Sequence, residues 1–149
     1  MGVPLVRAHR VPLAGVGGDE VLDVLVQAAD IPEADWLSGH RGVDLEAAAG
    51  QEILASRGGV VYFAGSVAGT PVVSIQHSDG VRTTYEPVIA EVAKGQVVRR
   101  GQVIGALADA ASLPETARKA DGLSWGARLG EGYVDPLELL GQVRVRLYP

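Results

Sequence analysis

The sequence predicts a mostly β fold built as a single domain. The chain has 149 residues, which is close to the usual size of one domain. It contains 20 Gly and 8 Pro, and apolar runs of about four to eight residues lie between these turn formers. Hydrophobic residues make up 47% and charged residues 21%, so the chain can bury a core and disorder is disfavoured. We therefore expect many short strands joined by tight turns.

The beginning of the chain is the part whose structure is hardest to predict. Residues 1–23 are expected to form an N-terminal tail or lead-in, and residues 24–149 the folded domain. Within 19–29 the apolar residues recur at helical spacing, which predicts a helix. The same apolar run precedes Pro32, which suits an edge strand that a proline ends. Both interpretations of this segment stay open.

The rest of the chain has the signature of strands and turns. Asp79-Gly80, between two β-rich runs, predicts a hairpin. The polar stretch 109–121 is expected to be a surface loop with one helical turn. Apolar and β-branched runs bounded by turn residues predict strands. The predicted strands are 51–56, 60–64, 71–77, 82–86, 88–92, 102–107, 123–129 and 142–147.

Composition excludes several classes of function. Thirteen Lys+Arg against 18 Asp+Glu give a net charge of −5, which argues against a general nucleic-acid binder because phosphate contacts need a basic face. The absence of Cys excludes disulfides, Cys-based zinc sites and a thiol nucleophile. No apolar run reaches the roughly 18 residues of a membrane span, and residues 1–13 lack the apolar centre of a signal peptide. The only imidazoles are His9, His40 and His77.

His40 and Asp44 are the first candidates for a metal site. Gly39 and Gly42 favour a loop that enters a strand, and positions four apart on a strand face the same side. The imidazole and the carboxylate can therefore hold two corners of a divalent metal site. The alternative is an exposed histidine beside an aspartate that stabilises a turn.

Four motifs occur in order along the chain, and together they resemble a known family. They are GHRGVDL at 39–45, IQHSDG at 75–80 leading to Thr84-Tyr85, VVRRGQVIG at 97–105, and LSWGAR at 123–128 followed by YVDPL at 133–137. This succession resembles the lysostaphin-type, LytM-like zinc endopeptidases, which cut peptide crosslinks in peptidoglycan. The resemblance covers about residues 24–140. It implies a mostly β LytM-like domain (duplicated hybrid motif, or barrel-sandwich) in which two sheets flank a groove with zinc on its floor.

The functional positions of that family are only partly filled in this chain. The resemblance implies His40 and Asp44 as zinc ligands, but the third ligand position falls on Ser124. The two positions that carry catalytic imidazoles fall on Pro87 and Gly122. A catalytic zinc needs three protein ligands and an open position for water, and a serine hydroxyl replaces imidazole poorly. We therefore expect no catalytic residue, no required cofactor, and at most low-affinity zinc at a vestigial site.

Three other residues are possible replacement ligands. His77 is in phase with Val73 and Ile75, so it is expected to be a structural histidine satisfied by a hydrogen bond within the sheet. His9 would reach the groove only if the N-terminus folded over it. Glu86 is adjacent to a lost catalytic position, where a carboxylate can act as base or ligand or can simply be solvated.

Other side chains are candidates for binding in the groove. Tyr85, Glu86 and Trp125 are near the expected groove, although a tryptophan on a strand also suits the core. Arg128 can pair with a substrate carboxylate, or with an acidic neighbour such as Glu131 or Asp135.

The sequence thus predicts a LytM-like metallopeptidase-family domain that has lost hydrolysis. Such a domain would act as a binding or regulatory module, with a peptidoglycan peptide or a cell-wall hydrolase as its partner. The alternative is an active zinc metalloendopeptidase with a rebuilt site, in which His77 or Glu86 joins His40 and Asp44. A biotin or lipoyl carrier is disfavoured because neither lysine has a Met-Lys setting. The family works outside the cytoplasm, but the given chain has no signal peptide, so its location stays open.

Overall fold

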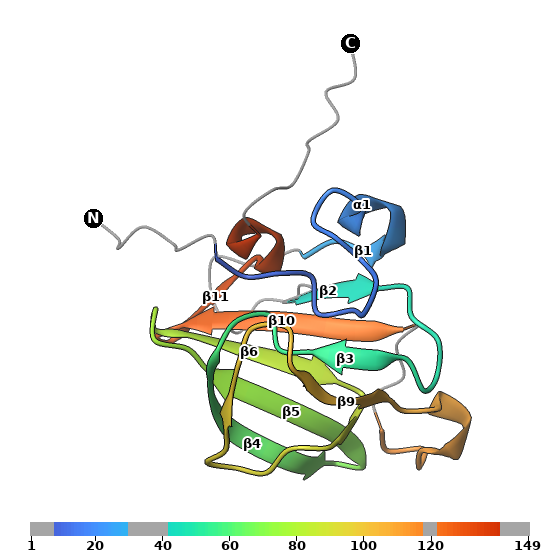
Figure 1. Ribbon diagram of the computed structural model, residues 1–149. Helices are drawn as coiled ribbons and strands as arrows, with labels where there is room; N and C mark the ends of the chain where they lie inside the picture. Colours follow the sequence, from blue (N-terminus) through green and yellow to red (C-terminus); the bar gives the residue numbers. More distant parts are fainter. Residues whose placement is uncertain (1–7, 30–41, 118–121, 141–149) are drawn as a thin grey trace.

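The computed structural model describes residues 8–29, 42–117 and 122–140, and it confirms the mostly β class. Antiparallel strands form one large and one small sheet (Figure 1). The large sheet has the order β1-β2-β10-β6-β5-β4-β8, with β11 paired to β10, and the small sheet has the order β3-β9-β7. The strands are β1 Leu25–Gln27, β2 Gly42–Leu45, β3 Glu52–Leu54, β4 Gly59–Val67, β5 Thr70–Gln76, β6 Val81–Glu86, β7 Val88–Ala90, β8 Val97–Val98, β9 Val103–Leu107, β10 Leu123–Leu129 and β11 Gly132–Val134.

Helical structure is confined to short turns in the described residues. Both interpretations of the segment 19–29 hold in part, because the one-turn helix α1 (Val21–Val24) passes directly into β1. The predicted helical turn in the polar stretch is the 3₁₀ helix η1 (Ala110–Ser112), and a second, η2 (Pro136–Leu139), follows β11. None of the helices seen in these ranges is long and apolar enough to cross a membrane. The strand predicted at 142–147 lies outside the described residues.

The hairpin predicted at Asp79-Gly80 joins β5 to β6. Gly80 has φ +86°, a conformation that glycine adopts without steric cost. The Asp79 carboxylate accepts a hydrogen bond from the backbone N–H of Val81 at 2.9 Å. This turn joins two neighbouring strands at the centre of the large sheet.

The core lies between the two sheets and includes the N-terminal segment. Its largest fully buried side chains include Trp125, Tyr85 and Ile104. Leu13 is also fully buried, and it forms an isolated antiparallel β-bridge with Ile53 of the small sheet. Figure 1 shows this first described segment, in dark blue, running across the domain close to η2. Val11, Leu13 and Val21, from the segment 1–23 predicted as an N-terminal tail or lead-in, are part of this core.

Strand β6 has two chemically different faces. Its inner residues Val81, Thr83 and Tyr85 are buried, and the residues between them are partly exposed on the outer face. Strand β10 pairs with β6 along six positions, including Ser124 with Glu86. Because residues that pair directly across two strands point to the same face, this register decides which side chains meet on the outside of the large sheet.

Candidate functional site

The strand register brings three candidate residues into one row across the large sheet. Ser124 of β10 pairs with Asp44 of β2 on one side and with Glu86 of β6 on the other. Side chains that pair directly across strands have Cβ atoms about 5 Å apart. Asp44 and Ser124 are buried, and Glu86 is partly exposed. The row therefore holds two carboxylates and a hydroxyl on the outer face.

A cavity of about 310 Å³ opens on this face, and we call it the sheet pocket. Two glycines form part of its lining. A Cβ at Gly126 would meet no atom within 4 Å, whereas a Cβ at Gly42 would lie 2.7 Å from the carbonyl oxygen of Trp125. The pocket thus exists where two paired strand positions have no side chain. It is lined by Gly42, Thr84, Glu86, Ser124, Gly126, Ala127, Arg128 and Tyr133.

The residues at the family's zinc and catalytic positions do not fit a zinc site in the part of the chain that is described. Gly122 has φ +95°, and a Cβ there would lie 2.1 Å from the carbonyl oxygen of Leu45, so this backbone leaves no room for an imidazole. Pro87 offers no ligand atom in its side chain. Among the described residues no group of three or more His, Cys, Asp or Glu could hold a metal ion. His40 lies outside these residues.

The two aromatic candidates for the groove are core residues. Tyr85 and Trp125 are fully buried, and neither lines the sheet pocket. The Tyr85 hydroxyl lies 2.6 Å from Thr83 Oγ1 on the inner face, and burial raises the pKa of the phenol. Of the three predicted groove residues, only Glu86 lines the pocket. The aromatic residue that lines the pocket is Tyr133, which was not among the predicted groove residues. Its position directly after Gly132, at the start of the YVDPL motif, is the sequence signal that could have indicated it.

His77 is a structural histidine, as expected. Its Nδ1 donates to the carbonyl oxygen of Gly58 at 2.9 Å, and its Nε2 lies 2.7 Å from Thr83 Oγ1. Because Thr83 is on the inner face of β6, the imidazole lies on the opposite side of the sheet from Glu86. Burial lowers the pKa of His77.

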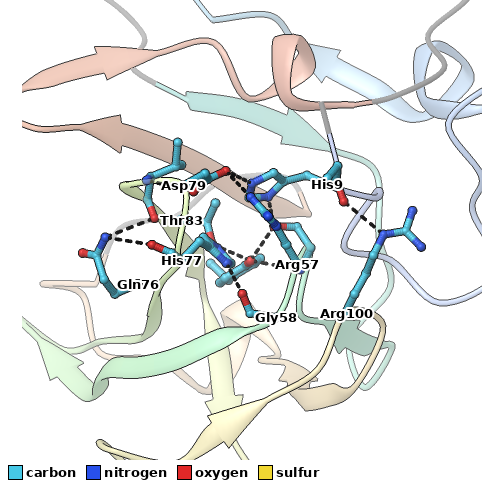
Figure 2. Close-up of polar contacts among 12 residues, drawn as sticks. His9, Arg57, Gly58, Gln76, His77, Asp79, Thr83 and Arg100 are labelled. Carbon is cyan, nitrogen blue, oxygen red and sulfur yellow. Dashed lines mark hydrogen bonds and ion pairs between the residues drawn. The ribbon is translucent and has the colours of Figure 1, made fainter. Parts of the chain in front are cut away.

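His9 joins His77 in a buried polar cluster that the sequence did not predict (Figure 2). His9 Nδ1 lies 2.8 Å from Ser56 Oγ, and its Nε2 lies 3.1 Å from Asp79 Oδ2. Arg57 Nη1 is 2.8 Å from the same carboxylate oxygen. The two imidazole rings meet edge to face with centroids 4.7 Å apart. We call His9, Ser56, Arg57, His77 and Asp79 the His9 cluster.

The charges of the His9 cluster are set by burial and by its hydrogen bonds. Burial lowers the pKa of His9 to about 4, against the raising effect of its hydrogen bond with Asp79. Burial acts to raise the pKa of Asp79, but hydrogen bonds from the Val81 N–H, His9 and Arg57 outweigh it, so the pKa is lowered. Because Ser56 has no exposed surface, its hydroxyl is not accessible to a substrate. The cluster therefore fastens the N-terminal segment to the β5–β6 hairpin.

Arg128 pairs with neither predicted acidic neighbour through its carboxylate. Its Nη2 donates to the backbone carbonyl of Glu131 at 3.3 Å, and its guanidinium lies 4.8 Å from the centroid of the Tyr133 ring. The Asp135 carboxylate instead accepts from the Leu137 N–H at the start of η2. The guanidinium thus lines the sheet pocket without an ion pair to any described residue.

Sequence comparisons link the chain to one family and to mycobacterial proteins. A family model described as Peptidase family M23 matches residues 38–136. The uncharacterized protein Rv2891 of Mycobacterium tuberculosis is 46% identical over 128 residues, covering 84% of this chain and 51% of that protein. The chain therefore spans about half the length of the curated relatives that it matches.

Solved structures share the fold at low sequence identity. Csd3 of Helicobacter pylori matches with a TM-score of 0.67 and 22% identity, over 97% of this chain and 36% of that chain. A zinc-containing peptidase from Vibrio cholerae matches with a TM-score of 0.68 and 18% identity, over 95% and 41%. The catalytic domain of lysostaphin from Staphylococcus simulans matches with a TM-score of 0.65 and 20% identity, over 85% and 98%.

Proposed function

Because the chain belongs to peptidase family M23, we propose that it is a catalytically inactive member that acts as a peptidoglycan-binding or regulatory module. The observation that carries this proposal is the row formed by Asp44, Ser124 and Glu86. At the third ligand position this row has a hydroxyl where the family resemblance implies an imidazole. The expected ligand is a cell-wall peptide in the sheet pocket, and any zinc would be bound weakly.

The chemistry of the row suits binding better than hydrolysis. Ser124 is neutral and hard to deprotonate, so it is a poor zinc ligand. Neither Pro87 nor Gly122 can move a proton to or from a water molecule, which removes the acid-base groups that peptide hydrolysis needs. The carboxylate of Glu86 and the hydroxyls of Ser124 and Thr84 line the pocket, and groups of these kinds form hydrogen bonds with a peptide.

The fold by itself does not imply that the domain hydrolyses peptides, because proteins with one fold can have different functions. A chain of the SpoIIQ–SpoIIIAH pore-forming complex shares this fold, with a TM-score of 0.55 and 21% identity. A role in a complex with another protein is therefore compatible with the architecture.

Zinc stoichiometry is the experiment that separates this proposal from an active enzyme. Purified protein, dialysed against zinc-containing buffer and then against chelator-free buffer, is expected to carry well under one zinc per chain in elemental analysis. It is also expected not to clear a peptidoglycan suspension. Stoichiometric zinc that is lost in His40→Ala, together with clearing of the suspension, would establish the alternative, a zinc endopeptidase with a rebuilt site.

Binding is tested by sedimentation with purified peptidoglycan. The wild-type chain is expected to pellet with it. Gly126→Val places a side chain in the open space of the sheet pocket and is expected to abolish sedimentation while the melting temperature stays close to that of the wild type. Ser66→Val is the matched control, because Ser66 is an exposed strand residue of β4 away from the pocket. Equal sedimentation of both variants would mean that the pocket is not the binding site.

A further inference from the structure

The outer face of the large sheet carries two arginines side by side. Arg82 of β6 and Arg128 of β10 are direct cross-strand partners, so their side chains leave the same face. Both residues are partly exposed. Like charges directly opposite each other destabilise an antiparallel strand pair. The chain has a net charge of −5, so a close pair of positive side chains on one face is unusual and indicates a local site for an anion.

Neighbouring groups hold both guanidinium groups in place without neutralising them. The centroid of the Tyr62 ring lies 3.6 Å from Arg82 Cζ, and the centroid of the Tyr133 ring lies 4.8 Å from Arg128 Cζ. Arg82 Nε donates to Gln76 Oε1 at 3.1 Å, and Arg128 donates to a backbone carbonyl. Within the described residues neither arginine forms an ion pair with a carboxylate.

Arg128 also has unused hydrogen-bonding capacity. Its Nε is buried and has no hydrogen-bond partner among the described residues. A buried donor without a partner carries an uncompensated desolvation cost, which a ligand removes when it supplies an acceptor. A guanidinium presents a planar fork of donors that matches a carboxylate in a bidentate way. The donor set at this end of the sheet pocket is therefore that of an anion site.

We propose that Arg82 and Arg128 bind the free C-terminal carboxylate of a short peptide whose chain lies along the sheet pocket. This inference rests on the proposed function and names the chemical group by which that pocket recognises its ligand. Ser124 and Arg128 are four residues apart on β10, which is about 13 Å along a strand. The pocket thus takes about four residues of extended peptide, with the carboxylate at the arginine pair and the opposite end beside Glu86 and Ser124.

The test compares one peptide with and without its negative charge. Tetra-alanine with a free carboxylate is titrated into the whole chain and followed by backbone amide chemical shifts, alongside tetra-alanine C-terminal amide. We expect the free acid to shift the signals of Arg82, Arg128 and Gly126 and to bind at least about tenfold more tightly than the amide, a difference of about 1.4 kcal/mol. Equal binding of acid and amide would overturn the inference.

Variants and a second anion complete the experiment. Arg82→Gln and Arg128→Gln are each expected to weaken binding of the free acid about tenfold, whereas Arg99→Gln, an exposed arginine of the β8–β9 turn, leaves it unchanged. Circular dichroism and the melting temperature verify that each variant is folded. Inorganic phosphate that binds as tightly as the peptide acid, with the same sensitivity to the variants, would mean a general anion site and would overturn the peptide assignment.

The outcomes distinguish this inference from the proposed function. If the wild type sediments with peptidoglycan but acid and amide bind equally, the carboxylate site is wrong and the binding function stands. If the free acid binds at the arginine pair but the chain does not sediment with peptidoglycan, the carboxylate site stands and the cell-wall function is wrong.

Discussion

The imidazole Nε2 of His9 lies 3.1 Å from the carboxylate Oδ2 of Asp79, across 70 residues of the chain. This contact joins the N-terminal segment to the β5–β6 hairpin (Figure 2). The same histidine contacts Ser56 through its other nitrogen, and its ring meets the ring of His77 edge to face. One side chain therefore connects the N-terminal segment to the centre of the fold.

The stability of the domain is expected to fall as the pH falls from about 6.5 to about 4. Burial lowers the folded-state pKa of His9 to about 4, so between these values the unfolded chain binds a proton that the folded chain does not. The loss assigned to His9 is about 3 kcal/mol. Urea denaturation of the wild type and of His9→Gln at pH 7 and pH 4.5 checks this. A variant whose stability falls as steeply as that of the wild type would contradict it.

His77 is expected to be the Nδ1–H tautomer at neutral pH. The Gly58 carbonyl can only accept, so the imidazole must donate from Nδ1, and Nε2 then accepts from the Thr83 hydroxyl. Nitrogen-15 NMR of the histidine side chains distinguishes the two tautomers directly. Thr83→Val removes the hydroxyl and is expected to destabilise the fold by about 1–3 kcal/mol, since it leaves the buried Nε2 without a donor. Detection of the Nε2–H tautomer in the wild type would contradict this assignment.

Gly122→Ala is expected to destabilise the domain by at least about 2 kcal/mol. The position combines φ +95° with a Cβ only 2.1 Å from the Leu45 carbonyl oxygen, so a methyl group must displace the backbone. Gly126→Ala, four residues further along and within β10, is the matched control, because its Cβ meets no atom within 4 Å. Thermal melting of both variants is the measurement, and similar losses in the two would show that the close approach at Gly122 does not matter.

Zinc binding is expected to return in part when imidazoles are restored at two positions. Ser124→His with Pro87→His places one ring in the row beside Asp44 and another at the end of β6, and this double variant is expected to bind zinc more tightly than the wild type. Adding Gly122→His is expected to lower the melting temperature sharply for the steric reason given above. Calorimetric zinc titration and thermal melting test the two parts separately. A stable triple variant would contradict the steric argument.

Much of the fold could be predicted from residue patterns. Turn residues at Asp79-Gly80 and the apolar alternation of 82–86 gave correct positions for β5 and β6, because both signals act over a few neighbouring residues. Tyr85 is in phase with the apolar Val81, so its burial could also have been read from the strand period.

Long-range docking could not be predicted in the same way. The contact of His9 with Asp79 depends on how an N-terminal segment folds back onto a distant hairpin, and no local pattern encodes that path. The meeting of Arg82 with Arg128 depends on the register of β6 against β10, which the packing of the whole sheet determines. The close approach of Gly122 to Leu45 likewise appears only in three dimensions.

The side chains of β6 point alternately to the interior and to the outer surface, so the two faces of this strand have different roles. Thr83 and Tyr85 belong to the buried hydrogen-bonded interior, whereas Arg82, Thr84 and Glu86 face the outer surface. Substitutions on the outer face therefore leave the interior contacts intact. A scaffold of this kind can therefore exchange the side chains of one face while the hydrogen-bonded interior that determines the fold stays the same.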